Sequence, residues 1–116
     1  MENKRYCFVN VIKDEFIRDY KKLHKNPWEE IPKAIKSVGV KELIIWSYGN
    51  LAIVYFECDD IDRVYDELGK FEVITKWNAT LKPWLKESPV IDNSGKVITL
   101  EKVFDLNEQI KGVSLL

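Results

Sequence analysis

The sequence predicts a single α+β domain, residues 1–116, built around one antiparallel sheet in the order β-α-β-β-α-β. Two apolar patterns lead to this prediction: short runs typical of strands, and longer stretches with apolar side chains at the three- and four-residue spacing of helices. The third observation is the length, because 116 residues are enough for one hydrophobic core and too few for two.

The first strand is predicted over residues 6–11, where nearly every side chain is apolar and aromatic or β-branched types are frequent. A helical stretch follows over residues 16–38. Because a residue that precedes proline resists helical torsion angles, Pro27 interrupts this stretch, and the first helix should end near His24. His24 is therefore expected at a helix C-terminus, beside a corner of the chain.

The second helical segment should begin at this corner. Asn26 can cap it, Pro27 suits its first position and Glu29 can complete a capping box. Pro32 should bend this helix because it removes an interior hydrogen bond, and Gly39 should end it.

A hairpin is predicted next, with strands over residues 43–48 and 51–58 joined by a tight turn at Gly49 and Asn50. An amphipathic helix follows over residues 60–68, where apolar residues recur at helical spacing.

The C-terminal part should contain a helix over residues 71–85, disturbed near its end by Pro83, and the last strand within residues 97–106. Residues 106–116 would form a C-terminal tail. The complete order of elements is that of ferredoxin-like α+β domains.

Both faces of the predicted hairpin are apolar. Ile44, Trp46 and Tyr48 should project to one face, and Leu43 to the other. Helices in this topology cover one face only, so the opposite face would be a large apolar patch. The sequence therefore predicts a homodimer with two sheets face to face, and a pocket lined by hairpin aromatics and the corner that carries His24.

Composition argues against several classes of partner. The 18 basic and 19 acidic residues give a net charge of −1 without a long basic run, so neither nucleic acid nor a membrane is an expected partner. The first residues are polar and no long apolar run follows them, which favours the cytoplasm. Cys7 and Cys58 lack the spacing of zinc ligands, and no metal site is expected.

His24 is the only histidine, and the ordinary pKa of imidazole allows it to accept and donate a proton near neutral pH. Tyr20 lies four residues earlier, so on a helix the two side chains share a face. The imidazole would then act as the acid and base, with the phenol as its hydrogen-bonding neighbour. The structural alternative places Tyr20 in the core and leaves His24 as a favourable charge at the helix end.

Four tryptophans are many for a chain of this length. Aromatic faces suit the C–H faces of sugar rings, while indole N–H and phenol O–H groups can meet hydroxyls. We therefore expect a neutral, polyhydroxylated or flat ligand; the alternative is that each tryptophan belongs to the core or to a dimer contact. The predicted ligand-binding side chains are Tyr20, Trp28, Trp46, Tyr48, Trp77 and Asn78.

Several blocks of the sequence carry a family resemblance. The blocks that carry it are the phrase Tyr-x-x-x-His-x-x-x-Trp at Tyr20, His24 and Trp28, then residues 36–39, Trp77 and residues 100–104. With these blocks in this order, most of the chain resembles the L-rhamnose mutarotases. The resemblance implies a dimeric α+β barrel that interconverts the α and β anomers of a 6-deoxyhexose without cofactor or metal. It places the family's proton donor on His24 and a substrate-contacting tyrosine on Tyr20.

Two positions depart from the family pattern. Leu43 stands where a tyrosine is expected, and Asn78 follows Trp77 in place of a second tryptophan. The expected substrate is therefore L-rhamnose or a stereoisomer such as L-fucose. The alternatives are a non-catalytic sugar-binding dimer and a dimeric-barrel monooxygenase or haem-degrading enzyme.

Overall fold

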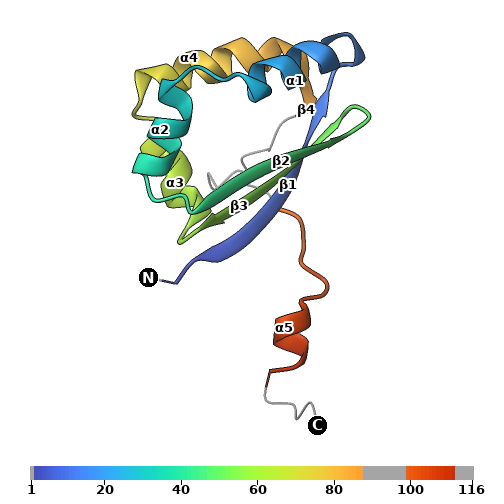
Figure 1. The fold of residues 1–116 in the computed structure, drawn as a ribbon, viewed down its shortest axis with the longest axis vertical. Helices are drawn as coiled ribbons and strands as arrows, with labels where there is room; N and C mark the ends of the chain where they lie inside the picture. The colour runs from blue at the N-terminus through green and yellow to red at the C-terminus, as the bar shows by residue number, and fades with distance from the viewer. Residues whose placement is uncertain (1, 88–98, 112–116) are drawn as a thin grey trace.

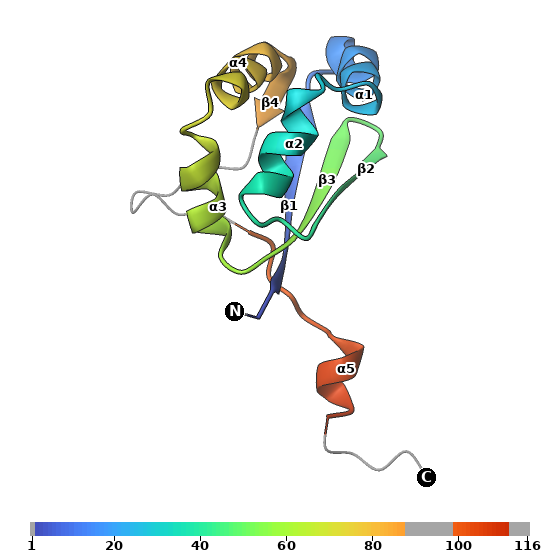
Figure 2. The ribbon, with the colours of Figure 1, turned by 60° about the vertical axis from the view of Figure 1, so that its left-hand side comes forward.

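The computed structural model describes residues 2–87 and 99–111. Its strands form one antiparallel sheet in the order β2-β3-β1-β4, which confirms the predicted ferredoxin-like fold. Helices α1 to α4 all cover the same face of the sheet (Figures 1 and 2). The strands are β1 (Lys4–Ile12), β2 (Glu42–Tyr48), β3 (Leu51–Cys58) and β4 (Leu85–Glu87), and the helices are α1 (Ile17–Lys25), α2 (Glu30–Ser37), α3 (Ile61–Leu68), α4 (Glu72–Leu81) and α5 (Leu106–Gln109), with 3₁₀ turns at Asp14–Phe16 and Lys82–Trp84.

The core lies between the helices and the inner face of the sheet. Because side chains alternate along a strand, every second residue of β3 is buried and its neighbours are half-buried on the outer face. The buried residues of β3 are Ala52, Val54, Phe56 and Cys58, and β1 adds Phe8, Asn10 and Ile12.

The hairpin forms as predicted. Tyr48 pairs with Leu51 across the turn, and Gly49 has a φ of 57°. This left-handed conformation favours glycine, because a Cβ atom would meet the neighbouring backbone.

The corner after α1 is also present, although its details differ from the prediction. α1 ends at Lys25, but α2 begins at Glu30, so Asn26 does not cap it and Pro27 is not its first residue. Pro32 is the third residue of α2. A helix has no internal partner for the N–H groups of its first turn, so Pro32 removes no hydrogen bond there and no bend is required. Gly39 follows the helix with a φ of 90°.

The last strand is not where the sequence predicts it. Residues 97 and 98 lie outside the described residues, 99–105 belong to no helix or strand, and Leu106 begins α5. The edge position beside β1 is taken by β4, which begins at the last residue of the segment predicted to be helical; Leu85 pairs with Ile12. α4 stops at Leu81, and the turn that contains Pro83 redirects the chain to the sheet.

Residues 99–111, which we call the arm, leave the sheet beside β1 and extend away from it (Figure 1). The N–H of Leu100 donates to the carbonyl oxygen of Cys7 at 2.6 Å. The arm exposes several large apolar side chains, namely Leu100, Val103, Phe104 and Leu106.

Candidate active site

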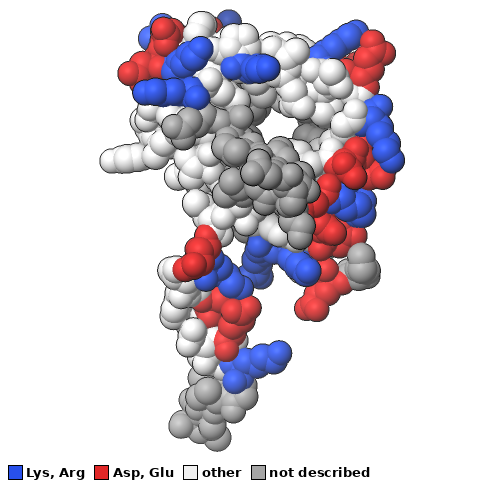
Figure 3. Space-filling model, turned by 180° about the vertical axis from the view of Figure 1, so that it is seen from behind, with Lys and Arg blue, Asp and Glu red and all other residues white. Residues whose placement is uncertain are grey.

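A pocket of about 620 Å³ lies between the inner face of the sheet and the helices. The space-filling view is open at the same place (Figure 3). The apolar wall of the pocket includes Phe8, Ile31, Ile35, Leu43, Ile45, Val54, Phe56 and Trp77. Polar groups reach it from Asn10, Tyr20, His24, Tyr65, Asn78, Lys82 and Lys86. No carboxylate belongs to the described lining, so this pocket differs from a metal or cation site.

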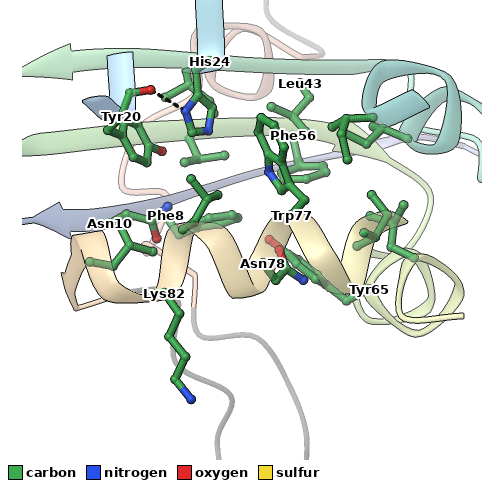
Figure 4. A pocket seen from close by; sticks show the side chains of 18 of the residues that line it. Phe8, Asn10, Tyr20, His24, Leu43, Phe56, Tyr65, Trp77, Asn78 and Lys82 are labelled. Atoms are coloured by element: carbon green, nitrogen blue, oxygen red, sulfur yellow. Dashed lines mark hydrogen bonds between the residues drawn. The ribbon is translucent and has the colours of Figure 1, made fainter. Parts of the chain in front are cut away.

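His24 lies in the last turn of α1 and faces this pocket (Figure 4). Its Nδ1 is 2.8 Å from the carbonyl oxygen of Tyr20, one helical turn earlier. A carbonyl oxygen can only accept, so Nδ1 carries the hydrogen and Nε2 is the basic nitrogen of the neutral ring.

Two aromatic rings hold the imidazole in place. The ring of Tyr20 stacks on it with centroids 4.0 Å apart, and Trp77 meets it edge-on at 5.4 Å. Trp28 in turn meets Trp77 edge-on at 5.2 Å. His24 is thus oriented by one backbone bond and two rings, and its position depends on the packing of α1 against α4.

Burial sets the protonation of the site. It lowers the pKa of His24 below the ordinary value of 6.5, and the bond to the Tyr20 carbonyl opposes this shift to a smaller extent. Burial raises the pKa of Tyr20, against a smaller effect of the Asn10 amide. Near neutral pH the site therefore holds a neutral imidazole and a protonated phenol.

A family model described as L-rhamnose mutarotase matches residues 5–106. The chain belongs to the L-rhamnose mutarotase family. An L-rhamnose mutarotase of Clostridium beijerinckii is 30% identical over 90 residues, which are 76% of this chain and 84% of that protein. The family consists of isomerases that act on carbohydrates, and this chain is an isomerase of that class.

Solved structures of two proteins share the fold. The L-rhamnose mutarotase of Formosa agariphila superposes with a TM-score of 0.66 at 20% identity and covers 88% of this chain and 97% of its own. The tetracenomycin F2 cyclase of Streptomyces glaucescens gives a TM-score of 0.54 at 15% identity, covering 88% and 95%. The family fold is therefore also found in an enzyme with a different name.

The pocket of this mutarotase-family chain brings together four of the side chains predicted from sequence, namely Tyr20, His24, Trp77 and Asn78. Trp77 is buried in α4, and Asn78, the next residue, is exposed at the pocket. Trp28 does not line the pocket, and its contact with Trp77 makes it a support for the wall.

Trp46 and Tyr48, which were predicted to bind the ligand, do not line this pocket. They are 55% and 78% exposed on the outer face of β2, while Leu43 and Ile45 face the helices. The two-residue period of a strand allows only one of these sets to face inward. The prediction for Trp46 and Tyr48 rested on their aromatic character, whereas the face of the strand on which a side chain lies determines what it contacts.

Asn10, Tyr65, Lys82 and Lys86 are polar residues of the pocket that were not predicted from the sequence, and for Asn10 a signal was available. Asn10 is the one strongly polar residue in the apolar run of residues 6–11, and this interruption is the signal that was available. In the structure it lies on the inner face of β1 beside Tyr20 (Figure 4).

Within residues 2–87 and 99–111 no group of three or more His, Cys, Asp or Glu side chains is placed to hold a metal ion. Among these same residues no helix has the length and apolar character needed to cross a bilayer. Acidic and basic side chains are interspersed on the face shown in Figure 3, so that face carries no broad basic patch.

Proposed function

We propose that the protein is an aldose mutarotase that interconverts the α and β anomers of L-rhamnose or a related 6-deoxyhexose such as L-fucose. The observation that carries this proposal is the placement of His24, whose Nδ1 is 2.8 Å from the Tyr20 carbonyl oxygen, so that its basic Nε2 is left for a ligand in a pocket large enough for a monosaccharide. Family membership supports the same reaction class.

Mutarotation needs only proton transfers and one reversible C–O bond cleavage. Nε2 of His24 accepts the proton of the anomeric hydroxyl, the bond between C1 and the ring oxygen breaks, and C1 becomes a carbonyl carbon. The imidazolium then gives its proton to the ring oxygen. After rotation about the C1–C2 bond, the same steps in reverse close the ring on the other face of the carbonyl. Protons balance, and the enzyme returns to its initial state.

Tyr20 supports this cycle in two ways. Its carbonyl oxygen holds the Nδ1 hydrogen of His24, which fixes the tautomer, and its phenol lines the same pocket as a hydrogen-bond donor. Because burial keeps this phenol protonated, it can stabilise negative charge on a sugar oxygen while the proton moves.

The pocket walls suit a 6-deoxy sugar. Phe8, Phe56 and Trp77 offer apolar surface for C–H faces and a methyl group. Asn78 offers an amide at the position where the family pattern has a second tryptophan, and this favours an additional polar contact. We assign the ligand to the neutral 6-deoxyhexoses, without cofactor or metal, and the protein to the cytoplasm.

We also propose that the protein is a homodimer. The outer face of the sheet exposes Ile44, Trp46 and Tyr48, and no described helix covers it. An apolar face of this kind is costly in water, and a second sheet packed on it removes that cost. Trp46 and Tyr48 then act at the interface.

Saturation-transfer NMR between the two anomers tests the catalytic proposal. His24→Gln should lower the anomer-exchange rate by about 10²–10⁴-fold, the range for a positioned acid or base. Lys25→Gln is the matched control, because Lys25 is exposed in the same helical turn and should leave the rate unchanged. Exchange by His24→Gln at the parent rate contradicts the proposal. Sugar-dependent thermal protection with exchange at the buffer rate would instead identify a non-catalytic sugar-binding protein.

A further inference from the structure

Asn10 carries a hydrogen-bonding group that the described part of the chain does not use. The side chain lies between Phe8 and Ile12 on the inner face of β1 and is 9% exposed. Its Oδ1 has no hydrogen-bond partner among the described residues. Buried amide oxygens are almost always paired in folded proteins, so an unpaired one in a pocket needs an explanation.

The same amide also lies beside the phenol of Tyr20 (Figure 4). Burial raises the pKa of the Tyr20 phenol, and Asn10 lowers it to a smaller extent. This direction is the one expected when the amide N–H donates to the phenol oxygen. Exchanging the amide nitrogen and oxygen by rotation would let the phenol donate to Oδ1 and would leave the nitrogen free. In either orientation Tyr20 can satisfy one end only, and the second end remains available in the pocket.

The surroundings of Asn10 supply no replacement partner. Next to Asn10 on the inner face of the sheet lie Phe8, Ile12 and its cross-strand partner Ala52, which are apolar and buried. The strand alternation that points Asn10 inward also prevents the side chain from reaching solvent on the outer face. The second end of the amide is therefore open to a group that enters the pocket.

We propose that the amide of Asn10 hydrogen-bonds one hydroxyl group of the bound sugar and selects monosaccharides that carry a hydroxyl at that position. This inference rests on the proposed function, since the ligand is taken to be a 6-deoxyhexose. Asn10 is a specificity residue: it binds the ring from β1 while His24 acts from α1, and it takes no part in the proton transfer. A site built to pair a hydroxyl rejects an analogue without it, because a buried polar group then stays unpaired.

The experiment measures binding and not catalysis. Dissociation constants for L-rhamnose, L-fucose and their monodeoxy analogues are determined by NMR titration of the parent, Asn10→Leu and Asn107→Leu. Asn107 lies on the exposed arm, so Asn107→Leu makes the same chemical change away from the pocket. Asn10→Ser, which is too short to reach the same hydroxyl, is the second variant should Asn10→Leu fail to fold.

The parent should bind one monodeoxy analogue about tenfold to hundredfold more weakly than the complete sugar. Asn10→Leu should bind the complete sugar as weakly as that analogue, show no further loss with the analogue, and unfold at the same or a higher temperature. Equal affinity of Asn10→Leu and the parent for the complete sugar would overturn the inference. It would also be overturned if the substitution and the removal of the sugar hydroxyl each weakened binding independently, so that the two losses of affinity added in full. Failure of the parent to bind any 6-deoxyhexose would defeat the proposed function as well, which separates the two results.

Discussion

The Nδ1 of His24 donates to the carbonyl oxygen of Tyr20 at 2.8 Å, while the rings of the same two residues stack with centroids 4.0 Å apart. One helical turn therefore supplies both the orientation of the imidazole and its tautomer. No carboxylate has this role among the described residues of the pocket. A carboxylate would raise the pKa of the imidazole, whereas here burial lowers it.

The titration of His24 follows from this arrangement. The chain contains a single histidine, so one set of imidazole signals reports on the site. Its midpoint in the folded protein is expected below the ordinary value of 6.5, because burial disfavours the imidazolium. Long-range ¹H–¹⁵N NMR measures the midpoint and identifies the tautomer. A midpoint above 6.5, or a hydrogen on Nε2 of the neutral ring, contradicts the structure.

The same shift predicts the pH dependence of activity. The neutral ring is the base, so the ratio kcat/KM for anomer exchange should be constant near neutral pH and fall only on the acid side, with the midpoint measured for His24. Saturation transfer at a series of pH values gives this profile. A rate that rises as the pH falls would show that the imidazolium is the form that starts the reaction.

Stability should depend on pH through His24 as well. Between the lowered folded pKa and 6.5, the unfolded chain binds more protons than the folded chain, so the free energy of unfolding decreases as the pH falls through this interval. Urea unfolding of the parent and of His24→Gln at roughly pH 5 and 7.5 isolates the contribution of His24 to this pH dependence. The variant should lose less stability than the parent on acidification, and equal losses would contradict the prediction.

Two substitutions at Tyr20 separate its roles. Tyr20→Phe keeps the stacked ring and the carbonyl but removes the phenol, so the anomer-exchange rate should fall about tenfold with the loss of one hydrogen bond and little change in stability. Tyr20→Ala removes a ring that is 3% exposed and should cost about 3–5 kcal/mol in the free energy of unfolding. Thermal unfolding and saturation transfer provide the two readings. An unchanged rate in Tyr20→Phe would limit Tyr20 to the orientation of His24.

The outer face of the sheet gives a prediction about assembly. Trp46→Asp places a charge at the proposed interface, where it would be buried without a partner, and should convert the dimer to a monomer. Sedimentation velocity measures the mass in solution. Lys25→Gln, which changes an exposed side chain of α1 on the helical side of the sheet, should leave it unchanged. A parent that sediments as a monomer would contradict the proposal directly.

The N-cap of α3 provides a test of the fold that should not touch the reaction. The Asp60 carboxylate accepts from the backbone N–H groups of Asp62 at 3.0 Å and of Arg63 at 3.4 Å. Asp60→Ala should lower the free energy of unfolding by about 1 kcal/mol, as for other helix caps, with no change in anomer exchange. Urea unfolding checks the first part, and a large fall in the exchange rate of the folded variant would contradict the second.

Much of the fold could be predicted from local patterns. The three- to four-residue spacing after residue 16, the proline at position 27 and the turn at Gly49 each act within a few residues, and α1, its corner and the hairpin formed accordingly. The start of α2 was harder to predict. A favourable capping residue such as Asn26 offers one of several possible starts, and packing of the corner selected another.

The edge strand could not be predicted in the same way. Residues 85–87 carry little strand signal of their own and form β4 because the free edge of β1 lies beside them. The exposure of Trp46 and the burial of Asn10 could not be predicted from local sequence either, because both depend on which side of the sheet the helices cover.

The sequence by itself determined the family blocks, the order of the main helices and strands, and the position of the single histidine at a helix end, because these depend on residue type and short spacing. Only the tertiary structure decided which side chains share the pocket with His24. A strand side chain contributes to a site only if the packed helices lie on its side of the sheet, and that choice is made by contacts between residues far apart in the chain.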